Sequence, residues 1–231
     1  MDAKSMLFFI YQYCGMKNFY GGMTGMSTQN ADRISQDRRE RAFHEALTYQ
    51  QFIDSAKVNV ERFQVNFEQY TLSKQELTYF KSLPDQINVL VLAHDWCGDV
   101  VANLPLFAKI ERETGKLKLH ILLRDPDNQD IAAAYLHKDG RNHIPTYVFF
   151  NGAGEELGLF IERPDQITDL ISTWKEEFWN LHPEWEGRGK ALSELDEKVK
   201  RSLLGYLNEQ RPKAREQEKT AIIESIRSIL G

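Results

Sequence analysis

The feature that most constrains the fold is the short apolar run Ile87–Ala93, which is followed at once by the residues His-Asp-Trp-Cys-Gly-Asp. Seven consecutive residues rich in Val and Leu predict a strand that is buried on both faces. A helix-like pattern begins at Val100, so Trp-Cys-Gly falls at the turn between strand and helix. Cys97 is therefore expected at a helix N-terminus, where unpaired N–H groups and the helix dipole favour thiolate over thiol.

Composition limits the class of protein. The chain has 231 residues, 42% of them hydrophobic and 27% charged, which fits one globular domain with helical additions or at most two small domains. The net charge of -5 argues against a dominant nucleic-acid surface. No apolar stretch reaches the roughly 20 residues that a membrane helix needs. Only two cysteines, Cys14 and Cys97, disfavour a secreted disulfide scaffold, so we expect a cytoplasmic protein.

The first 25 residues differ in character from the rest. Met6–Tyr13 is an apolar run too short for a signal peptide, and the glycines that follow it are a poor cleavage site. The residues before Cys14 are too large for a lipidation site. We expect residues 1–25 to be a disordered or spurious extension, in which Cys14 has no role. A weak membrane-directing segment is the alternative.

Helices are predicted ahead of the strand. From Ala31 to Ser82 apolar residues recur near a 3.6-residue period, and Ser73-x-x-Glu76 is a capping-box signature. Pro84 ends the last of these helices. We therefore expect residues 26–84 to be a helical lead-in packed on the core.

From Ile87 onward the pattern alternates between strand and helix in the order β-α-β-α-β-β-α. After the first strand the predicted elements are a helix over Val100–Thr114 kinked at Pro105, a strand at Leu117–Leu123, a helix over Asp127–His137, a strand at Thr146–Phe150, a hairpin turn at Asn151-Gly152, a strand at Leu157–Ile161 and a helix after Pro164. These elements define a domain over residues 85–185. Two amphipathic helices form a C-terminal extension, residues 186–231, whose apolar stripes are interpreted as packing surfaces rather than as a cofactor or partner site.

The residues and their order resemble the thioredoxin superfamily. The resemblance rests on Trp96-Cys97-Gly98 after a strand, on Pro105 inside the next helix, and on Ile144-Pro145 directly before a later strand. It implies an α/β thioredoxin fold, a central sheet flanked by helices. It also implies that the peptide bond before Pro145 is cis and faces Cys97.

The sequence more closely resembles a bacterial branch of thioredoxin-like proteins. That branch has a helical lead-in, the motif Asp-Trp-Cys-Gly-Asp and a second strand ending in Leu-Leu-Arg-Asp, which are here Asp95–Asp99 and Leu122–Asp125. The resemblance covers roughly Tyr49 to Trp185. Thioredoxin has a second cysteine where this chain has Val100, and members of the branch often lack that cysteine as well.

Cys97 is the predicted nucleophile, and its neighbours have competing interpretations. Asp95 and Asp99 oppose thiolate formation, because a nearby negative charge raises the pKa of a thiol. Asp99 either stabilises the first helical turn or handles a proton. Trp96 is expected to shield the cysteine and contact partners, as its counterpart does in the family, or is a plain core aromatic. His94 either offsets the acids when protonated or ends the strand as a neutral side chain.

Pro145 and Ile144 are the predicted docking edge. A cis proline beside the active cysteine exposes backbone groups that can pair with a substrate strand, unless the turn simply needs a cis bond. His143 and the two residues before it either bind an anionic partner, such as the carboxylate of a small thiol, or form a solvated loop. Gly98, next to Cys97, completes the predicted substrate-binding set.

Val100 cannot resolve a mixed disulfide, which disfavours a dithiol reductase cycle. The alternatives are monothiol exchange resolved by an external small thiol, a redox sensor, and a non-catalytic interaction domain. The first predicts a lowered Cys97 pKa and the last an inert thiol. No metal-ligand spacing, G-x-G-x-x-G or P-loop is found, so no metal or cofactor is expected. The expected partners are protein or small-molecule thiols and disulfides, with no nucleic acid and no membrane, and the oligomeric state is left open.

Overall fold

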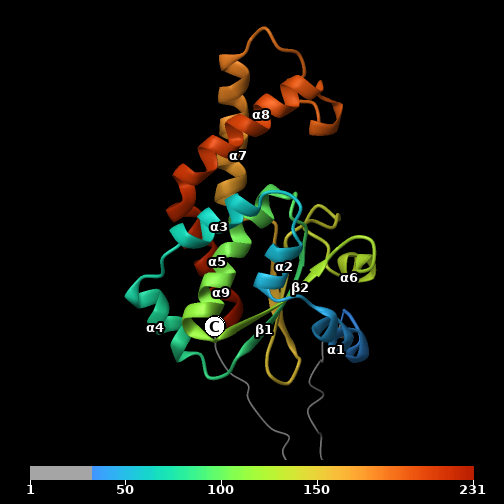
Figure 1. The fold of residues 1–231 in the computed structure, drawn as a ribbon, viewed down its shortest axis with the longest axis vertical. Coiled ribbons are helices and arrows are strands. Elements are labelled where there is room, and N and C mark those ends of the chain that lie inside the picture. Colours follow the sequence, from blue (N-terminus) through green and yellow to red (C-terminus); the bar gives the residue numbers. More distant parts are fainter. Residues whose placement is uncertain (1–32) are drawn as a thin grey trace, which may run out of the picture. The chain divides into compact units, whose positions relative to one another are not determined.

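The computed structural model describes residues 33–231 (Figure 1). At its centre is a four-stranded sheet in the order β2-β1-β3-β4. The strands are β1 (Ile87–Ala93), β2 (Leu117–Leu123), β3 (Thr146–Phe150) and β4 (Glu156–Ile161). β1 is parallel to β2, whereas β3 is antiparallel to both of its neighbours. Every residue of β3 and all but one of β1 are buried, as expected of strands covered on both faces.

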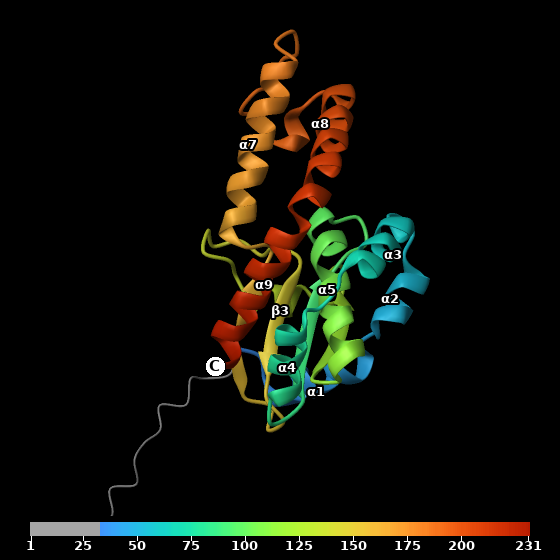
Figure 2. The ribbon, with the colours of Figure 1, turned by 90° about the vertical axis from the view of Figure 1, so that its left-hand side faces the viewer.

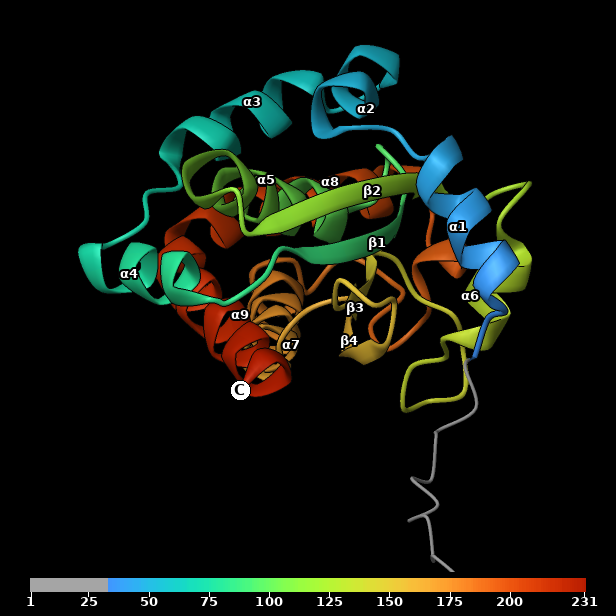
Figure 3. The same cartoon turned by 90° about the horizontal axis from the view of Figure 1, so that it is seen from below.

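Helices cover both faces of the sheet, which confirms the predicted α/β thioredoxin-like fold. One side is covered by α4 (Lys74–Ser82), α5 (Gly98–Thr114) and α9 (Arg215–Leu230), and the other by α1 (Gln36–Glu45) and α6 (Gln129–Ala134) (Figures 1 and 3). α5 contains Pro105 and ends at Gly115, which adopts the left-handed conformation, with φ of 65°. The helix that follows Cys97 therefore covers part of one face of the sheet (Figure 3).

The helical pattern ahead of β1 corresponds to four helices, since α2 (Tyr49–Ser55) and α3 (Val60–Gln69) lie between α1 and α4. The predicted capping box at the start of α4 is confirmed. The Ser73 hydroxyl accepts the N–H of Glu76, and the Glu76 carboxylate accepts the N–H of Ser73. The predicted extension over residues 1–25, with Cys14, lies outside the described residues.

These N-terminal helices share the core of the sheet. Leu47, just before α2, pairs with Ile121 at the outer edge of β2 through two backbone hydrogen bonds of 2.8 and 3.0 Å. Phe52, Phe63 and Phe80 are almost fully buried and belong to the same core cluster as the strands. The lead-in is therefore joined to the sheet by both packing and hydrogen bonds.

The C-terminal helices divide between two clusters. α9 contributes Ile222, Ile223 and Ile226 to the main core. In contrast, α7 (Asp165–Leu181) and α8 (Glu197–Gln210) pack against each other in a smaller cluster and lie side by side in Figures 1 and 2. That cluster consists of Phe178, Trp179, Leu195, Val199 and Leu203. None of the helices in residues 33–231 has the length and apolar character needed to cross a membrane.

One predicted helix is shorter than the sequence indicates. A helix was expected over Asp127–His137, but α6 ends at Ala134, and Tyr135 leaves the helical region with ψ of 74°. The reason is a competing turn, in which the N–H of His137 donates to the carbonyl of Arg141 at 2.8 Å. His137 therefore belongs to the loop before β3.

The predicted hairpin between β3 and β4 forms, but with a longer connection than two residues. The side-chain oxygen of Asn151 accepts the N–H groups of Ala153 and Glu155, and the residue with positive φ is Gly154 at 82° rather than Gly152. Asn151 thus organises a five-residue loop by an Asx-type turn.

Candidate functional site

Cys97 lies at the turn between β1 and α5, as predicted. It is the N-cap of α5 in an extended conformation, and its side chain is partly buried. The thiol donates a hydrogen bond from Sγ to the carbonyl oxygen of Ile144 at 3.3 Å, and the Ile144-Pro145 peptide bond is cis. The fold therefore brings Cys97, Ile144 and Pro145 together from segments that are far apart in the sequence.

The environment of Cys97 stabilises the thiol over the thiolate. Burial raises the pKa of Cys97, and the negative charge of Asp99 raises it further. The backbone N–H groups of Val100 and Asp99 and the charge of Arg211 act in the opposite direction but do not outweigh these effects. Burial and the charge of Asp99 therefore outweigh the helix N-terminus, and the pKa of Cys97 is raised rather than lowered.

Asp99 is a buried carboxylate clamped by two arginines. Arg163 donates from Nε and Nη2 to its two oxygens at 2.7 and 2.6 Å, and Arg211 Nη1 lies 2.7 Å from Oδ1. Burial raises the pKa of Asp99, but Arg211 and Arg163 together hold it below its usual range. The geometry therefore favours a fixed negative charge at the start of α5 over the proton-handling role.

The ion pairs around Asp99 continue in both directions. Arg163 also pairs with Glu162 at 2.6 Å, and Arg211 pairs with Glu218 at 2.6 Å. The network thus links the end of β4, the start of α5 and the start of α9. Sequence reasoning missed both arginines, because Arg163 is 64 residues from Asp99 and no local pattern connects them.

Trp96 is 57% exposed, so the interpretation as a plain core aromatic is wrong. Its ring stacks on His94 with 5.3 Å between centroids. His94 in turn accepts the backbone N–H of Asp125 at Nε2, at 3.1 Å, so its ring faces Asp125 rather than the acids near Cys97. Trp96 therefore presents an aromatic surface next to the thiol.

Asp95 and Gly98 lie on either side of Trp96-Cys97 and have different surroundings. The Asp95 carboxylate accepts the N–H groups of Lys57 and Val58 at 2.6 and 3.1 Å, and so holds the loop between α2 and α3. Gly98 is exposed, and a Cβ built there would meet no atom within 4 Å. Packing therefore does not require glycine at position 98, and the space beside Cys97 is open.

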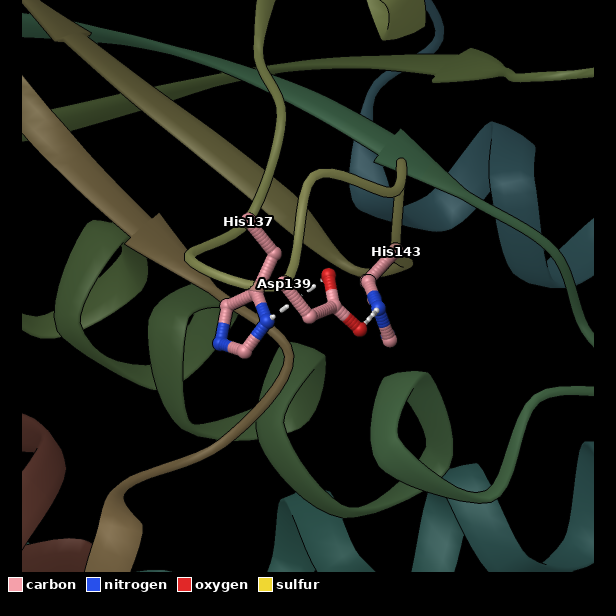
Figure 4. A group of neighbouring side chains, drawn as sticks. All are labelled: His137, Asp139 and His143. Atoms are coloured by element: carbon pink, nitrogen blue, oxygen red, sulfur yellow. Dashed lines mark hydrogen bonds and ion pairs between the residues drawn. The ribbon is translucent and has the colours of Figure 1, made fainter.

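His143, expected to bind an anion, is instead flanked by two carboxylates. Its Nε2 lies 2.9 Å from Oδ2 of Asp139 and its Nδ1 lies 3.3 Å from Oε2 of Glu162. His137 lies on the other side of Asp139, so three side chains gather in this loop (Figure 4). This negative surrounding makes His143 a poor ligand for a carboxylate.

Comparison with known proteins shows which family the chain belongs to. A family model described as thioredoxin matches residues 46–175, more than half of the chain. The chain belongs to the thioredoxin family. An HIV epitope-scaffold structure is similar at 21% identity and a TM-score of 0.49, covering 56% of this chain and 80% of its own. A Pseudomonas aeruginosa protein of unknown function is similar at 18% identity and a TM-score of 0.48, covering 74% and 97%. No curated protein matches the chain.

This thioredoxin-family protein has one thiol at its site. Val100, at the position of the second cysteine of thioredoxin, is fully buried. Within residues 33–231 Cys97 is the only cysteine. The arrangement can therefore form one mixed disulfide, and no second thiol from the described residues is placed to resolve it.

Proposed function

We propose that this thioredoxin-family protein performs thiol-disulfide exchange through Cys97 alone, with an external small thiol completing the cycle. The observation that carries the proposal is the position of the Cys97 Sγ, at the N-terminus of α5 and 3.3 Å from the carbonyl oxygen of Ile144, next to Pro145. The exposed Trp96 supports it by offering a contact surface beside the thiol.

Exchange takes place in two steps. The Cys97 thiol first loses its proton to solvent, and the thiolate attacks one sulfur of a substrate disulfide. A new S–S bond forms and the other sulfur leaves as a thiolate. A small thiolate then attacks the substrate sulfur of the mixed disulfide, so that Cys97 leaves as a thiolate and the small thiol is joined to the substrate. Each step breaks one S–S bond and forms another.

The environment of Cys97 sets the conditions for this chemistry. Its raised pKa leaves little thiolate at neutral pH, although the intrinsic nucleophilicity of a thiolate increases with its pKa. Deprotonation also removes the hydrogen bond from Sγ to the carbonyl of Ile144. That carbonyl is then available to a backbone N–H of an extended substrate. Loss of the proton would thus prepare both the nucleophile and the docking edge.

The test is adduct formation with a small disulfide such as oxidised glutathione, followed by intact mass from about pH 6 to pH 10, a range that spans the ordinary thiol pKa of about 8.5. In a Cys14→Ser background we expect no adduct once Cys97 is also replaced by Ser, and a single adduct when Cys97 is retained, formed at a rate that rises above that pKa. A small thiol should then release it. Absence of a Cys97 adduct at high pH, under conditions where the unfolded chain reacts, would contradict the proposal.

The second candidate is a non-catalytic interaction domain. The hydrogen bond from Cys97 Sγ to the carbonyl of Ile144 and the charge of Asp99, which both disfavour the thiolate, support this candidate. This candidate predicts that Cys97 reacts far more slowly than a free thiol even when the two are compared at equal thiolate fractions. The same pH series therefore separates the two functions.

A further inference from the structure

The loop between α6 and β3 gathers two imidazoles around one carboxylate (Figure 4). His137 Nδ1 lies 3.3 Å from Oδ1 of Asp139, and His143 Nε2 lies 2.9 Å from Oδ2. The ligand atoms of the three residues all lie within 4.8 Å of one another. Ligand atoms around a tetrahedral ion with bonds of about 2.0 Å are roughly 3.3 Å apart. Each imidazole nitrogen lies near this distance from one of the two Asp139 oxygens, His137 from Oδ1 and His143 from Oδ2.

The loop holds this arrangement with its own backbone. The N–H of His137 donates to the carbonyl of Arg141, and the N–H of Gly140 donates to the carbonyl of His137. The N–H of Arg141 donates to Oδ1 of Asp139 at 3.0 Å. That bond holds one carboxylate oxygen in place, so the loop itself fixes the position of Asp139.

Glu162 supports His143 from behind. Its Oε2 lies 3.3 Å from His143 Nδ1, while Arg163 holds its other oxygen at 2.6 Å. Metal-binding histidines usually donate their second ring nitrogen to a carboxylate, which fixes the tautomer and the direction of the ring. Glu162 is placed to do this, and it leaves Nε2 of His143 directed at Asp139.

Ion pairing within the loop does not satisfy all three groups. His137 Nδ1 is buried and makes no hydrogen bond to any of the described residues, because its contact with Asp139 has poor geometry. Meanwhile the side chains of Asp139 and His143 are 43% and 25% exposed, which allows an ion and water to enter. Two imidazoles and one carboxylate with an open position suit zinc and similar divalent ions.

We propose that His137, Asp139 and His143 bind one divalent transition-metal ion of the zinc class, with water in the remaining position. The site does not depend on Cys97 acting in exchange. Histidine and cysteine spacing does not indicate this site, because one of its three ligands is Asp139 and the sequence predicts His137 inside a helix. A bound ion would tie the loop directly to Ile144, the residue that accepts the Cys97 thiol hydrogen bond.

The test is calorimetric titration of the full, chelator-stripped chain with Zn²⁺, repeated with Co²⁺ to record visible absorption. We expect one ion per chain and an increase in melting temperature on binding. His137→Gln, Asp139→Asn and His143→Gln should each weaken binding by at least about tenfold, and Glu162→Gln by about 10- to 100-fold. Asn at position 139 still accepts the N–H of Arg141, so the loop should keep its fold.

His182→Gln is the matched control, since His182 also pairs with a single carboxylate, Glu184, at 3.4 Å and is comparably exposed. Zinc binding should be unchanged in His182→Gln, in Cys97→Ser and in Cys14→Ser. Three results would overturn the proposal. They are stoichiometric binding that persists in all three loop variants, loss of binding in either cysteine variant, and no binding to the wild type. A thiolate-to-cobalt charge-transfer band would do the same.

Discussion

Replacing Asp99 with Asn should both weaken the fold and activate Cys97. Removing one partner of a buried ion pair costs about 3–5 kcal/mol. Here Arg163 keeps Glu162 and Arg211 keeps Glu218, so each guanidinium retains one carboxylate and we expect the lower end, about 3 kcal/mol. For a chain of this size that corresponds to a decrease in melting temperature of about 6 to 12 °C.

The same substitution changes the charge that acts on Cys97. Asp99 raises the thiol pKa and Arg211 lowers it, so Asp99→Asn removes the opposing charge and leaves the favourable one. The pKa of Cys97 should fall, and each unit of decrease multiplies the thiolate fraction at neutral pH by about ten. Alkylation at pH 7 by iodoacetamide should therefore be faster in the variant than in the wild type.

Urea unfolding measures the first effect, and alkylation rate against pH measures the second. Asp165→Asn is the matched control, because that carboxylate also pairs with a cation, Lys138, at 2.6 Å but is 78% exposed. It should cost between about 0 and 1 kcal/mol and leave the Cys97 profile unchanged. Equal stability losses in the two variants, or a Cys97 pKa that does not fall in Asp99→Asn, would refute the reasoning.

Three further predictions concern the resolving thiol, the pH dependence of stability and the C-terminal helix. Val100→Cys should increase disulfide reductase turnover with a dithiol-regenerating system, since an intramolecular thiol has a very large effective concentration; no gain would argue against Cys97 as the nucleophile. Folding raises the Cys97 pKa. The contribution of the protonated thiol to the free energy of unfolding is therefore complete below the unfolded pKa of about 8.5 and is lost as the pH rises through the folded pKa. Unfolding curves of wild type and Cys97→Ser should diverge above about pH 8.5. Ile223→Ala should cost about 2–5 kcal/mol by urea unfolding, because this side chain is 2% exposed in the main core, whereas Leu204→Ala, at 38% exposed, should cost much less.

The sequence was most informative where a pattern is local. Strands β1, β2 and β3 were predicted to the residue, since each is a short apolar run bounded by turn-forming residues. The position of Cys97 followed from the same strand-to-helix junction. The sign of its pKa shift did not, because the shift depends on burial and on the distance to Asp99, which become known only when the chain is folded.

The lack of long-range information in a sequence pattern also explains why the arginines around Asp99 and the loop before β3 were not predicted. Arg163 and Arg211 reach Asp99 from distant segments, and periodicity contains no information on such pairs. Helix propensity around Ala134 was overridden by the turn that binds His137 to Arg141. Long-range pairing and turn geometry, rather than composition, therefore decide the chemistry of this site.

The pairing of Asp99 with Arg211 also sets the order in which the protein can mature on the ribosome. Residue 99 is synthesised 112 residues before residue 211. At about 5–20 residues per second, the carboxylate waits about 6 to 22 s for its second arginine. By the end of that time all four strands and α5 have been made and Arg163 is present, yet the carboxylate still lacks Arg211. The nascent chain thus passes through a stage in which the carboxylate at the start of α5 has only one of its two arginines, and the segment just before α9 supplies the other.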